Sequence, residues 1–449
     1  MNQKYNHIYF IGIGGISMSA LAEIMIAEGV RVSGSDRNSS HIVKKLEALG
    51  AKIYINHESK NITEDIDLVV YTSAIANDNP ELLKAQELNL NIMDRAEFLG
   101  LLMKNYNNVI CVSGTHGKTT TTGMLSSILI ETDMKPTIFL GGEMDSLGGN
   151  LLRGSNDLML TEACEYKRNF LKFNPTMEII LNIDQDHLDY YKDLNDIESA
   201  FVEYAELIPE KGHLIVNEKH KQLFSLLKCN VLTFGWELSA DYYPQNINLL
   251  PFPSYTLMHK GQKIADISLK VFGEHNILNS VAAAAAMLSL GIHADTVKNG
   301  LFDFKGTHRR YEYKGSLQGA SIIDDYAHHP SEMIATLKTA KAYTNGRVIT
   351  VFQPHTYTRT KKLLKEFAEA LTYTDEVILL DIYAAREINT GEIHSKDILA
   401  KMKEIYNKDG HYAASFEEAA ALIKSIAQEG DTIITMGAGS VEGVAELLF

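Results

Sequence analysis

The chain has 449 residues, 45% of them hydrophobic and 22% charged, a composition typical of globular proteins and a length that suits about three domains. Its formal net charge of -15 excludes a broad surface for nucleic acid or anionic membranes, so anionic ligands must be bound by local features. We find no apolar stretch that could span a bilayer or serve as a secretory leader, and the cysteines lack a Cys-x-x-Cys spacing. We therefore expect a cytoplasmic protein without membrane insertion.

The first predicted domain covers residues 1–107 and opens with a strand, a glycine loop and a helix. Apolar residues 8–11 predict the first strand, and a second strand over 30–34 ends near Asp36. Glycines after a strand let the backbone approach a diphosphate, and an acid about 20 residues later can bind ribose hydroxyls. Ser17 replaces the third glycine of the dinucleotide fingerprint. The pattern predicts a diphosphate at a helix N-terminus, from a UDP-sugar or from NAD; a tight turn without a ligand is the alternative.

Strands and helices continue to alternate up to residue 107. Strands are expected over 51–55 and 68–71, and a helix is expected over 95–103. His57 follows the first of these strands and Ser73 follows the second, and side chains at the ends of parallel strands face the ligand crevice. Both are therefore candidate substrate contacts, although a solvated surface position is the alternative for His57.

The second predicted domain, residues 108–312, begins with a phosphate-binding pattern. An apolar strand runs into Gly-Thr-His-Gly-Lys-Thr at 114–119, and apolar residues at helical spacing follow. Glycines here would admit phosphate oxygens to backbone N–H groups, Lys118 would place a cation at the terminal phosphates, and the Thr119 hydroxyl would face magnesium. The usual loop has glycine where Val112 stands, so this is a shortened form. A Gly-Lys-Thr turn that binds no phosphate is the alternative.

Acidic residues follow two later strands of this domain. One expected strand ends at Glu162, and another over 179–183 precedes Asp186 and His187. If the sheet is parallel, both strand ends lie on the same edge as the glycine loop. The oxygen atoms of Thr119 and Glu162 suit Mg²⁺. His187 could bind the metal, orient a water molecule or cap the next helix.

Two further patterns lie before the third domain. His275, Asn276 and Asn279 lie at the start of an alanine-rich helix, and their side chains can read the edge of a purine. Arg309 and Arg310 lie close to the predicted domain boundary. Paired arginines suit bidentate contact with phosphate, and a surface salt bridge is the alternative.

The third predicted domain, residues 313–449, again alternates strands with helices. Strands are expected over 321–324, 348–352, 377–380 and 432–436, and polar residues follow each of them. Because parallel strands end at one edge of a sheet, these residues are expected to form a site. Its candidate members include Asp325, Tyr326, His328, His355, Arg359 and Arg386.

Together these motifs resemble the ATP-dependent Mur ligases of peptidoglycan synthesis, over essentially the whole chain. The resemblance is carried by Gly-Ile-Gly-Gly at 12–15, Gly-Thr-His-Gly-Lys-Thr at 114–119, Glu-Ala at 162–163, Asp-His at 186–187, His-Asn-Ile-Leu-Asn at 275–279, Asp-Asp-Tyr-Ala-His-His-Pro at 324–330 and Gln-Pro-His-Thr-Tyr-Thr-Arg at 353–359. The first and last motifs are typical of the branch that joins L-alanine to UDP-N-acetylmuramate, and of its close relatives. The central motifs identify only the wider family.

The resemblance implies an α/β fold of three domains. Residues 1–107 would form a Rossmann-like domain that binds the UDP-sugar, residues 108–312 a P-loop ATPase-like domain with a parallel sheet, and residues 313–449 a Rossmann-like domain that binds the amino acid. ATP would phosphorylate the lactyl carboxylate of UDP-N-acetylmuramate, and the amine of L-alanine would attack the resulting acyl phosphate. Such catalysis consists mainly of positioning and charge neutralisation.

The resemblance also assigns roles to residues. The catalytic residues would be Lys118, His187 and Arg310, and the ligands of Mg²⁺ would be Thr119, Glu162 and His187. The residues expected to bind ATP are Gly114, Thr115, His116, Gly117, Lys118, Thr119, Thr120, His275, Asn276, Asn279, Arg310 and Asp325. Those expected to bind the UDP-sugar are Gly12, Gly14, Gly15, Ile16, Ser17, Asp36, His57 and Ser73. Those expected to hold the amino acid are Tyr326, His328, His355 and Arg359.

Some positions depart from the family pattern. Cys-Glu-Tyr-Lys at 164–167 replaces a more acidic segment of many members, which leaves Glu162 intact but changes the neighbouring substrate contacts. Thr356 stands where many members have arginine, and Arg386 could take over its anionic partner. Other branches carry a carbamylated lysine near residues 201–206, where this chain has no lysine, so we expect none.

Three other functions fit part of the pattern. A recycling ligase that joins a whole tripeptide to the same sugar nucleotide shares nearly every motif. A non-catalytic protein that closes on ATP and a UDP-sugar would also need both glycine loops. An NAD-dependent oxidoreductase would use the first loop but leaves the loop at 114–119 unexplained.

Overall fold

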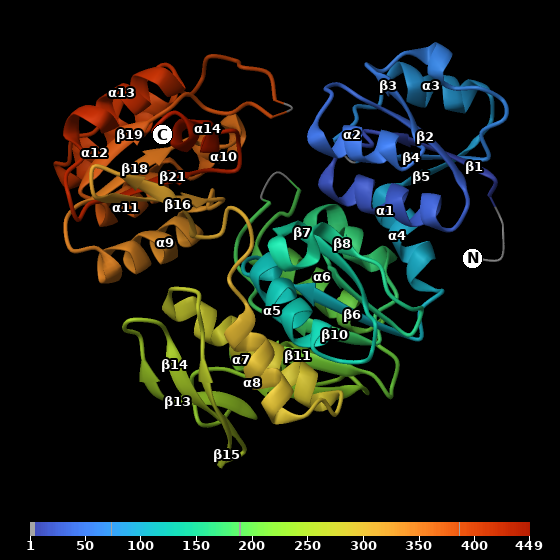
Figure 1. The fold of residues 1–449 in the computed structure, drawn as a ribbon, viewed down its shortest axis with the longest axis horizontal. Helices are drawn as coiled ribbons and strands as arrows, with labels where there is room; N and C mark the ends of the chain where they lie inside the picture. The colour runs from blue at the N-terminus through green and yellow to red at the C-terminus, as the bar shows by residue number, and fades with distance from the viewer. Residues whose placement is uncertain (1–4, 73, 188–189, 386) are drawn as a thin grey trace. The chain divides into compact units, whose positions relative to one another are not determined.

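The computed structural model describes residues 5–72, 74–187, 190–385 and 387–449, which form two compact units (Figure 1). Unit 1 consists of Met1–Tyr243, Leu257–Ala265 and Asn279–Leu301, and unit 2 of Pro244–Thr256, Asp266–Leu278 and Phe302–Phe449. The expected α/β architecture is confirmed, and the domain boundaries at 107/108 and 312/313 stay predictions. Among the helices of the described residues, none is long and apolar enough to cross a membrane.

The first sheet has five parallel strands in the order β3-β2-β1-β4-β5. The strand order reverses between β1 and β4, and open sheets of this kind bind ligands beyond the strand ends at that point. The expected strand over 68–71 and helix over 95–103 are confirmed. The elements are β1 (His7–Ile11), α1 (Ile16–Ala27), β2 (Arg31–Asp36), α2 (His41–Ala48), β3 (Lys52–Ile55), η1 (Ser59–Asn61), β4 (Leu68–Tyr71), α3 (Pro80–Glu87), β5 (Asn91–Asp94) and α4 (Arg95–Met103).

The second sheet has ten strands in the order β15-β14-β13-β12-β11-β10-β6-β9-β7-β8. Strand β6, which runs into the glycine loop, pairs in parallel with β9 and β10, so the expected shared edge is confirmed. The strands are β6 (Asn108–Ser113), β7 (Thr137–Met144), β8 (Gly149–Leu152), β9 (Leu158–Glu162), β10 (Met177–Ile180), β11 (His213–Asn217), β12 (Asn230–Phe234), β13 (Tyr242–Asn248), β14 (Ser254–His259) and β15 (Gln262–Ser268). The helices are α5 (Lys118–Ile130), η2 (Asp145–Leu147), η3 (Tyr166–Lys172), α6 (Leu194–Ala205), η4 (Glu218–Phe224), α7 (Glu274–Ser289) and α8 (Ala294–Asp303).

Strand β10 is shorter than the sequence predicts. The expected strand over 179–183 is wrong at its C-terminal end, because β10 ends at Ile180. Beyond it, Asn182 leaves the sheet and forms hydrogen bonds with the glycine loop. The chain therefore exchanges sheet pairing for contacts that shape the loop.

The third sheet has six strands in the order β16-β17-β21-β18-β19-β20, and only β16 is antiparallel to its neighbour. The expected strands over 348–352 and 432–436 are confirmed. The strands are β16 (Glu312–Leu317), β17 (Ala320–Asp325), β18 (Val348–Phe352), β19 (Glu376–Leu379), β20 (His411–Tyr412) and β21 (Thr432–Met436). The helices are α9 (Pro330–Tyr343), α10 (Tyr357–Lys362), α11 (Leu364–Ala370), η5 (Leu371–Tyr373), α12 (Ser395–Tyr406), α13 (Phe416–Ile426) and α14 (Glu442–Glu446).

One hydrophobic core joins the first sheet to the central part of the second. Phe98 on α4 packs edge to face on Phe10 at a centroid distance of 5.9 Å. Phe170 does the same with Phe201 on α6 at 5.3 Å, and all four rings belong to one buried cluster. Full burial of such a ring contributes about 1.5–3 kcal/mol. Because this core is shared, the elements next to both glycine loops belong to the same compact unit, unit 1.

A buried carboxyl group lies beneath the second glycine loop. Glu178 on β10 is fully buried, and the Ser113 hydroxyl donates a hydrogen bond to its Oε1 at 3.0 Å. Burial raises the pKa of Glu178 well above its ordinary value of 4.5, and the hydrogen bond from Ser113 only partly opposes this. The folded protein therefore holds a proton here that the unfolded chain releases.

We expect Glu178→Gln to stabilise the protein at pH 8 more than at pH 5. The stability that Glu178 contributes is fully present below pH 4.5 and is lost as the pH rises through its higher native pKa, at about 1.4 kcal/mol per pH unit. Glutamine carries no charge and can still accept from Ser113. Thermal unfolding midpoints of both proteins over this pH range measure the effect, and parallel pH profiles would contradict it.

Candidate active site

The loop between β6 and α5 has the backbone of a phosphate loop. Gly114 and Gly117 have φ angles of 130° and 85°, which side chains other than glycine rarely adopt. A Cβ at Gly117 would lie 2.8 Å from Asn279 Oδ1, and one at Gly114 would lie 3.1 Å from the backbone of Asn182. Both positions therefore require glycine, and α5 begins directly afterwards at Lys118.

Residues 182–184 support this loop. Thr115 N donates to Asn182 O at 3.2 Å, and His116 N donates to Asn182 Oδ1 at 2.8 Å. Asp184 N donates to the Thr115 hydroxyl at 2.9 Å. The N–H groups of Thr115 and His116 therefore donate hydrogen bonds inside the protein. Contacts of Thr115 and His116 with ATP stay predictions. The first N–H groups of α5, at Lys118, Thr119 and Thr120, have no acceptor within the helix and favour an anion.

Lys118 is paired with a residue that the sequence analysis did not assign. Its Nζ lies 3.1 Å from Glu165 Oε2 and donates to Gly114 O and Thr115 O. Glu165 is buried, and Tyr191 OH donates to its backbone oxygen. Burial alone would lower the pKa of Lys118, but the Glu165 carboxylate outweighs burial and the pKa is raised. Glu165 belongs to the segment that departs from the family pattern. Its position three residues after Glu162 was the one feature of the sequence that could have indicated a role near Lys118.

Thr119 and Glu162 are brought together as expected. Thr119 Oγ1 donates to Glu162 Oε2 at 3.1 Å, and Gly141 N donates to Glu162 Oε1 at 2.7 Å. A Cβ at Gly141 would lie 2.6 Å from Glu162 Oε2, so glycine lets the carboxylate approach β7. A hydroxyl and a carboxylate at this spacing form an oxygen donor set that fits Mg²⁺.

His187 lies beside Glu165. Its Nε2 is 3.8 Å from Glu165 Oε1 and 3.9 Å from Asp186 Oδ2, and its ring packs on Tyr166 at a centroid distance of 4.6 Å. The φ angle of His187 is 53°, which is uncommon outside glycine and asparagine. Its role as a metal ligand stays a prediction.

Helix α7 carries the three residues expected near the adenine. Asn279 is buried and lies against Gly117 of the phosphate loop. Asn276 is also buried, and its Nδ2 donates to Phe272 O at 2.7 Å. His275 is exposed at the start of the helix. The structure therefore places Asn279 at the phosphate loop, while adenine contacts by Asn276 and His275 stay predictions.

The first glycine loop precedes α1, at the point where the strand order of the first sheet reverses. Gly12 has a φ angle of 80°, and Gly12 N and Ile13 N donate to Ser35 O. Asp36 Oδ2 accepts from Gly14 N at 2.9 Å, so this acid braces the loop. Its contact with ribose stays a prediction. The remaining expected residues, Gly15, Ile16 and Ser17, lie at the start of α1.

His57 belongs to a buried hydrogen-bond network. Its Nδ1 lies 2.9 Å from Glu81 Oε2, and Glu81 also accepts from Ser35, Tyr9 and Asn61. Burial opposes the charge on Glu81, yet these hydrogen bonds lower its pKa. The alternative of a solvated surface position for His57 is therefore wrong, since only 10% of its side chain is exposed. Substrate contact by His57 stays a prediction, and Ser73 lies outside the described residues.

The two arginines before β16 have different roles. Arg309 Nε donates to Asp324 Oδ2 at 3.0 Å, and its other nitrogens donate to Gly437 O and Gly439 O. It is therefore a structural clamp of unit 2. The Arg310 guanidinium lies over the Tyr326 ring at 5.2 Å. Arg310 forms none of the hydrogen bonds that Arg309 makes with Asp324, Gly437 and Gly439. Arg310 is therefore a better candidate than Arg309 for a contact with phosphate.

Asp325 ends β17 and is buried. Its carboxylate accepts from Tyr311 N at 2.9 Å and from Ala327 N at 2.7 Å. Burial raises the pKa of Asp325 to about 6, although the positive charge of Arg310 opposes the shift. Both oxygens thus shape the following loop, and the expected contact with ATP stays a prediction.

Four aromatic side chains gather after the strands of the third sheet. The Tyr326 and His328 rings lie 5.4 Å apart, and the His328 and His355 rings 5.8 Å apart. Tyr383, which the sequence analysis left unassigned, stacks on His355 at 5.7 Å. Three of the residues expected to hold the amino acid thus lie together, and their role stays a prediction. Arg359 lies on the adjacent α10.

The residue that replaces the family arginine has an unusual backbone. Thr356 has a φ angle of 67°, and its N–H donates to Tyr383 O at 2.9 Å. A β-branched residue in this region is strained, and such strain is concentrated at functional loops. Arg386, the expected substitute for the missing arginine, lies outside the described residues.

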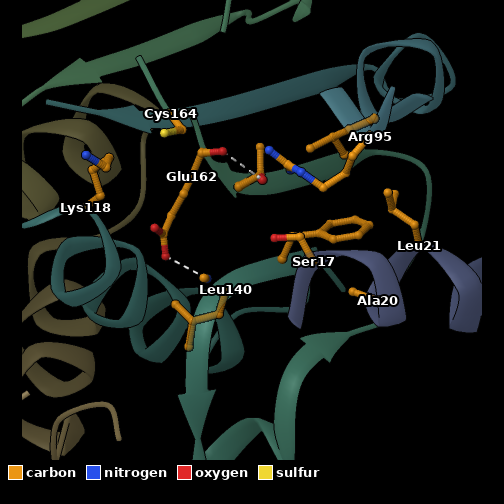
Figure 2. A pocket seen from close by; sticks show the side chains of 12 residues that line it. Ser17, Ala20, Leu21, Arg95, Lys118, Leu140, Glu162 and Cys164 are labelled. Carbon is orange, nitrogen blue, oxygen red and sulfur yellow. Dashed lines mark hydrogen bonds between the residues drawn. The ribbon is translucent and has the colours of Figure 1, made fainter. Parts of the chain in front are cut away.

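A pocket in unit 1 extends from the first turn of α1 to Lys118, the first residue of α5 (Figure 2). Ser17 and Ala20 of α1 line one side, and Lys118 and Glu162 line the opposite side. A ligand that extends from a diphosphate at α1 toward phosphates at α5 would pass through this pocket. The pocket therefore lies between the starts of the two helices that follow the glycine loops, and the two nucleotide sites stay predictions.

Three family models match the chain in sequence order. The "Mur ligase family, catalytic domain" matches residues 7–107, the "Mur ligase middle domain" residues 112–287, and the "Mur ligase, glutamate ligase domain" residues 309–439. Together they cover more than half of the chain and include all three sheets.

Individual proteins are similar over almost the whole length. UDP-N-acetylmuramate–L-alanine ligase of Acetivibrio thermocellus is 49% identical over 450 residues, which is 99% of this chain and 96% of that protein. The protein of the same name from Clostridium kluyveri is 49% identical over 449 residues, which is 99% of this chain and 98% of that protein. The crystal structure of UDP-N-acetylmuramate-alanine ligase from Thermotoga maritima has a TM-score of 0.84 at 30% identity, covering 98% of both chains. The sheet topology and these matches agree, and the chain belongs to the Mur ligase family.

Proposed function

We propose that this chain is an ATP-dependent ligase that joins L-alanine to the lactyl carboxylate of UDP-N-acetylmuramate, a step of peptidoglycan precursor synthesis in the cytoplasm. The observation that carries the proposal is the pocket of unit 1, in which Ser17 at the diphosphate-type loop and Lys118 at the phosphate loop line one space. The identity to ligases of this name supports the choice of substrates.

The first step is phosphoryl transfer. A carboxylate oxygen of the sugar nucleotide would attack the γ-phosphorus of ATP, and ADP would leave. Lys118 would move from Glu165 toward the phosphates and neutralise charge on the transferred group. Thr119 and Glu162 would hold Mg²⁺, which supplies further charge neutralisation when bound. Arg310 would contact the phosphates.

The second step forms the amide bond. The amine of L-alanine would attack the acyl phosphate carbon, and the tetrahedral intermediate would collapse with loss of phosphate. Arg359 would pair with the amino-acid carboxylate, because a guanidinium matches that group in bidentate geometry. Tyr326, His328 and His355 would surround the small side chain. Positioning of the amine would supply most of the rate acceleration in this step.

Phosphate release measured with ATP, Mg²⁺, UDP-N-acetylmuramate and a panel of amino acids tests the proposal. We expect release only when all substrates are present, and faster release with alanine than with serine or glycine. A parallel assay with a tripeptide tests the recycling activity. Release with the tripeptide and none with alanine would assign the chain to that activity, and no release under any condition would favour a binding protein.

A further inference from the structure

Arg95 places a positive charge at the N-terminal end of a helix. It is the first residue of α4, where the helix dipole is positive and disfavours a positive side chain. The preceding Asp94 is the N-cap, and its Oδ1 accepts from Ala96 N at 2.8 Å and from Glu97 N at 2.9 Å. Asp94 Oδ2 pairs with Lys172. The nearest carboxylate in sequence is therefore already engaged.

The Arg95 guanidinium forms no ion pair with a carboxylate among the residues that the structure describes. Throughout the part of the chain that the structure describes, no carboxylate or carbonyl oxygen accepts a hydrogen bond from it. Burial lowers the pKa of Arg95, and the nearby Cys164 and Asp94 oppose this shift only in part. Holding an uncompensated cation in such a place costs stability. A ligand with a negative charge would remove that cost.

The Arg95 side chain reaches into the pocket between the start of α1 and Lys118. Figure 2 shows the Arg95 nitrogens inside the pocket, on the side toward Glu162. Leu21 and Leu99 give the surrounding wall an apolar surface, which strengthens electrostatic interactions there. Arg95 therefore offers a partly buried planar donor between the start of α1 and Lys118.

We propose that Arg95 binds the carboxylate of the sugar nucleotide and selects a sugar nucleotide that carries one, an inference that rests on the proposed function. In the proposed function, the diphosphate would accept hydrogen bonds from the N–H groups at the start of α1. The phosphates of ATP would bind the N–H groups at the start of α5 and Lys118. The carboxylate must lie between these groups, close to the negative charge of Glu162. A guanidinium offsets this repulsion and orients both carboxylate oxygens through paired hydrogen bonds.

Binding of two nucleotides to the full-length protein tests this inference. UDP-N-acetylmuramate carries the carboxylate, whereas UDP-N-acetylglucosamine has the same nucleotide and ring but lacks it. By calorimetry, Arg95→Met should weaken binding of the first about 10- to 100-fold and that of the second less than about twofold. Arg95→Lys keeps the charge without the planar fork and should recover part of the difference.

A structural role for Arg95 predicts other results. Equal weakening of both nucleotides, or of neither, would overturn the inference. So would a lower thermal unfolding midpoint for ligand-free Arg95→Met, because removal of a partly buried cation that forms no ion pair should leave the midpoint unchanged or raise it. If the unaltered protein bound neither nucleotide, the proposed function itself would fail, and the inference with it.

Discussion

Lys118→Ala should lower turnover by roughly 10³-fold. Phosphoryl transfer spreads negative charge over the transferred group, and the fixed cation at the start of α5 is the side chain placed to offset it. Binding of the UDP-sugar should persist, because its predicted loop belongs to the first sheet. Steady-state phosphate release and calorimetric binding of UDP-N-acetylmuramate measure the two effects. Equal loss of both would contradict the separation of the two sites.

The pairing of Lys118 with Glu165 requires a matched control. Loss of the lysine leaves a buried carboxylate without its cation, which should lower the free energy of unfolding by up to about 3 kcal/mol. The double variant Lys118→Ala with Glu165→Ala removes both charges and should recover much of that stability. It should remain inactive. Recovery of activity with stability would mean that Lys118 acts only through the fold.

Glu162→Gln should lower turnover by roughly 10²-fold and raise the Mg²⁺ concentration needed for half-maximal activity at least about tenfold. The amide oxygen can still accept from Gly141 N, so the loop should keep its shape while the site loses one negative charge. Titration of phosphate release with MgCl₂ measures both effects.

Glu143→Gln is the matched control for this variant. Glu143 also lies in unit 1, on β7, but its carboxylate is paired with His41 at 3.3 Å. This substitution should leave the Mg²⁺ dependence unchanged. If Glu162→Gln gave the same Mg²⁺ titration as the control, the metal would have to be held by other residues.

Some elements were predictable because their causes are local. Helix α4 begins at Arg95 since Asp94 caps it and Glu97 completes the capping box, a signal contained in four consecutive residues. Strands β18 and β21 are short runs of mainly apolar and β-branched residues, which favour strands buried on both faces of a sheet. The end of β10 was not predictable, because residues 181–183 are as strand-like as the preceding ones. Their contacts with a loop 66 residues earlier decide the outcome.

The sequence by itself determined the phosphate loop at 114–119, the acids that follow the central strands, and membership of the Mur ligase family, because these depend on residue order along the chain. Only the tertiary structure decided that Glu165 pairs with Lys118, that His57 is buried with Glu81, and that Arg95 enters a pocket lined also by Glu162 without forming an ion pair among the described residues. Each of these depends on segments distant in sequence, and the order of strands in a sheet brings such segments together. Charge and burial at a point are sums over all neighbours, so no local pattern could have predicted them.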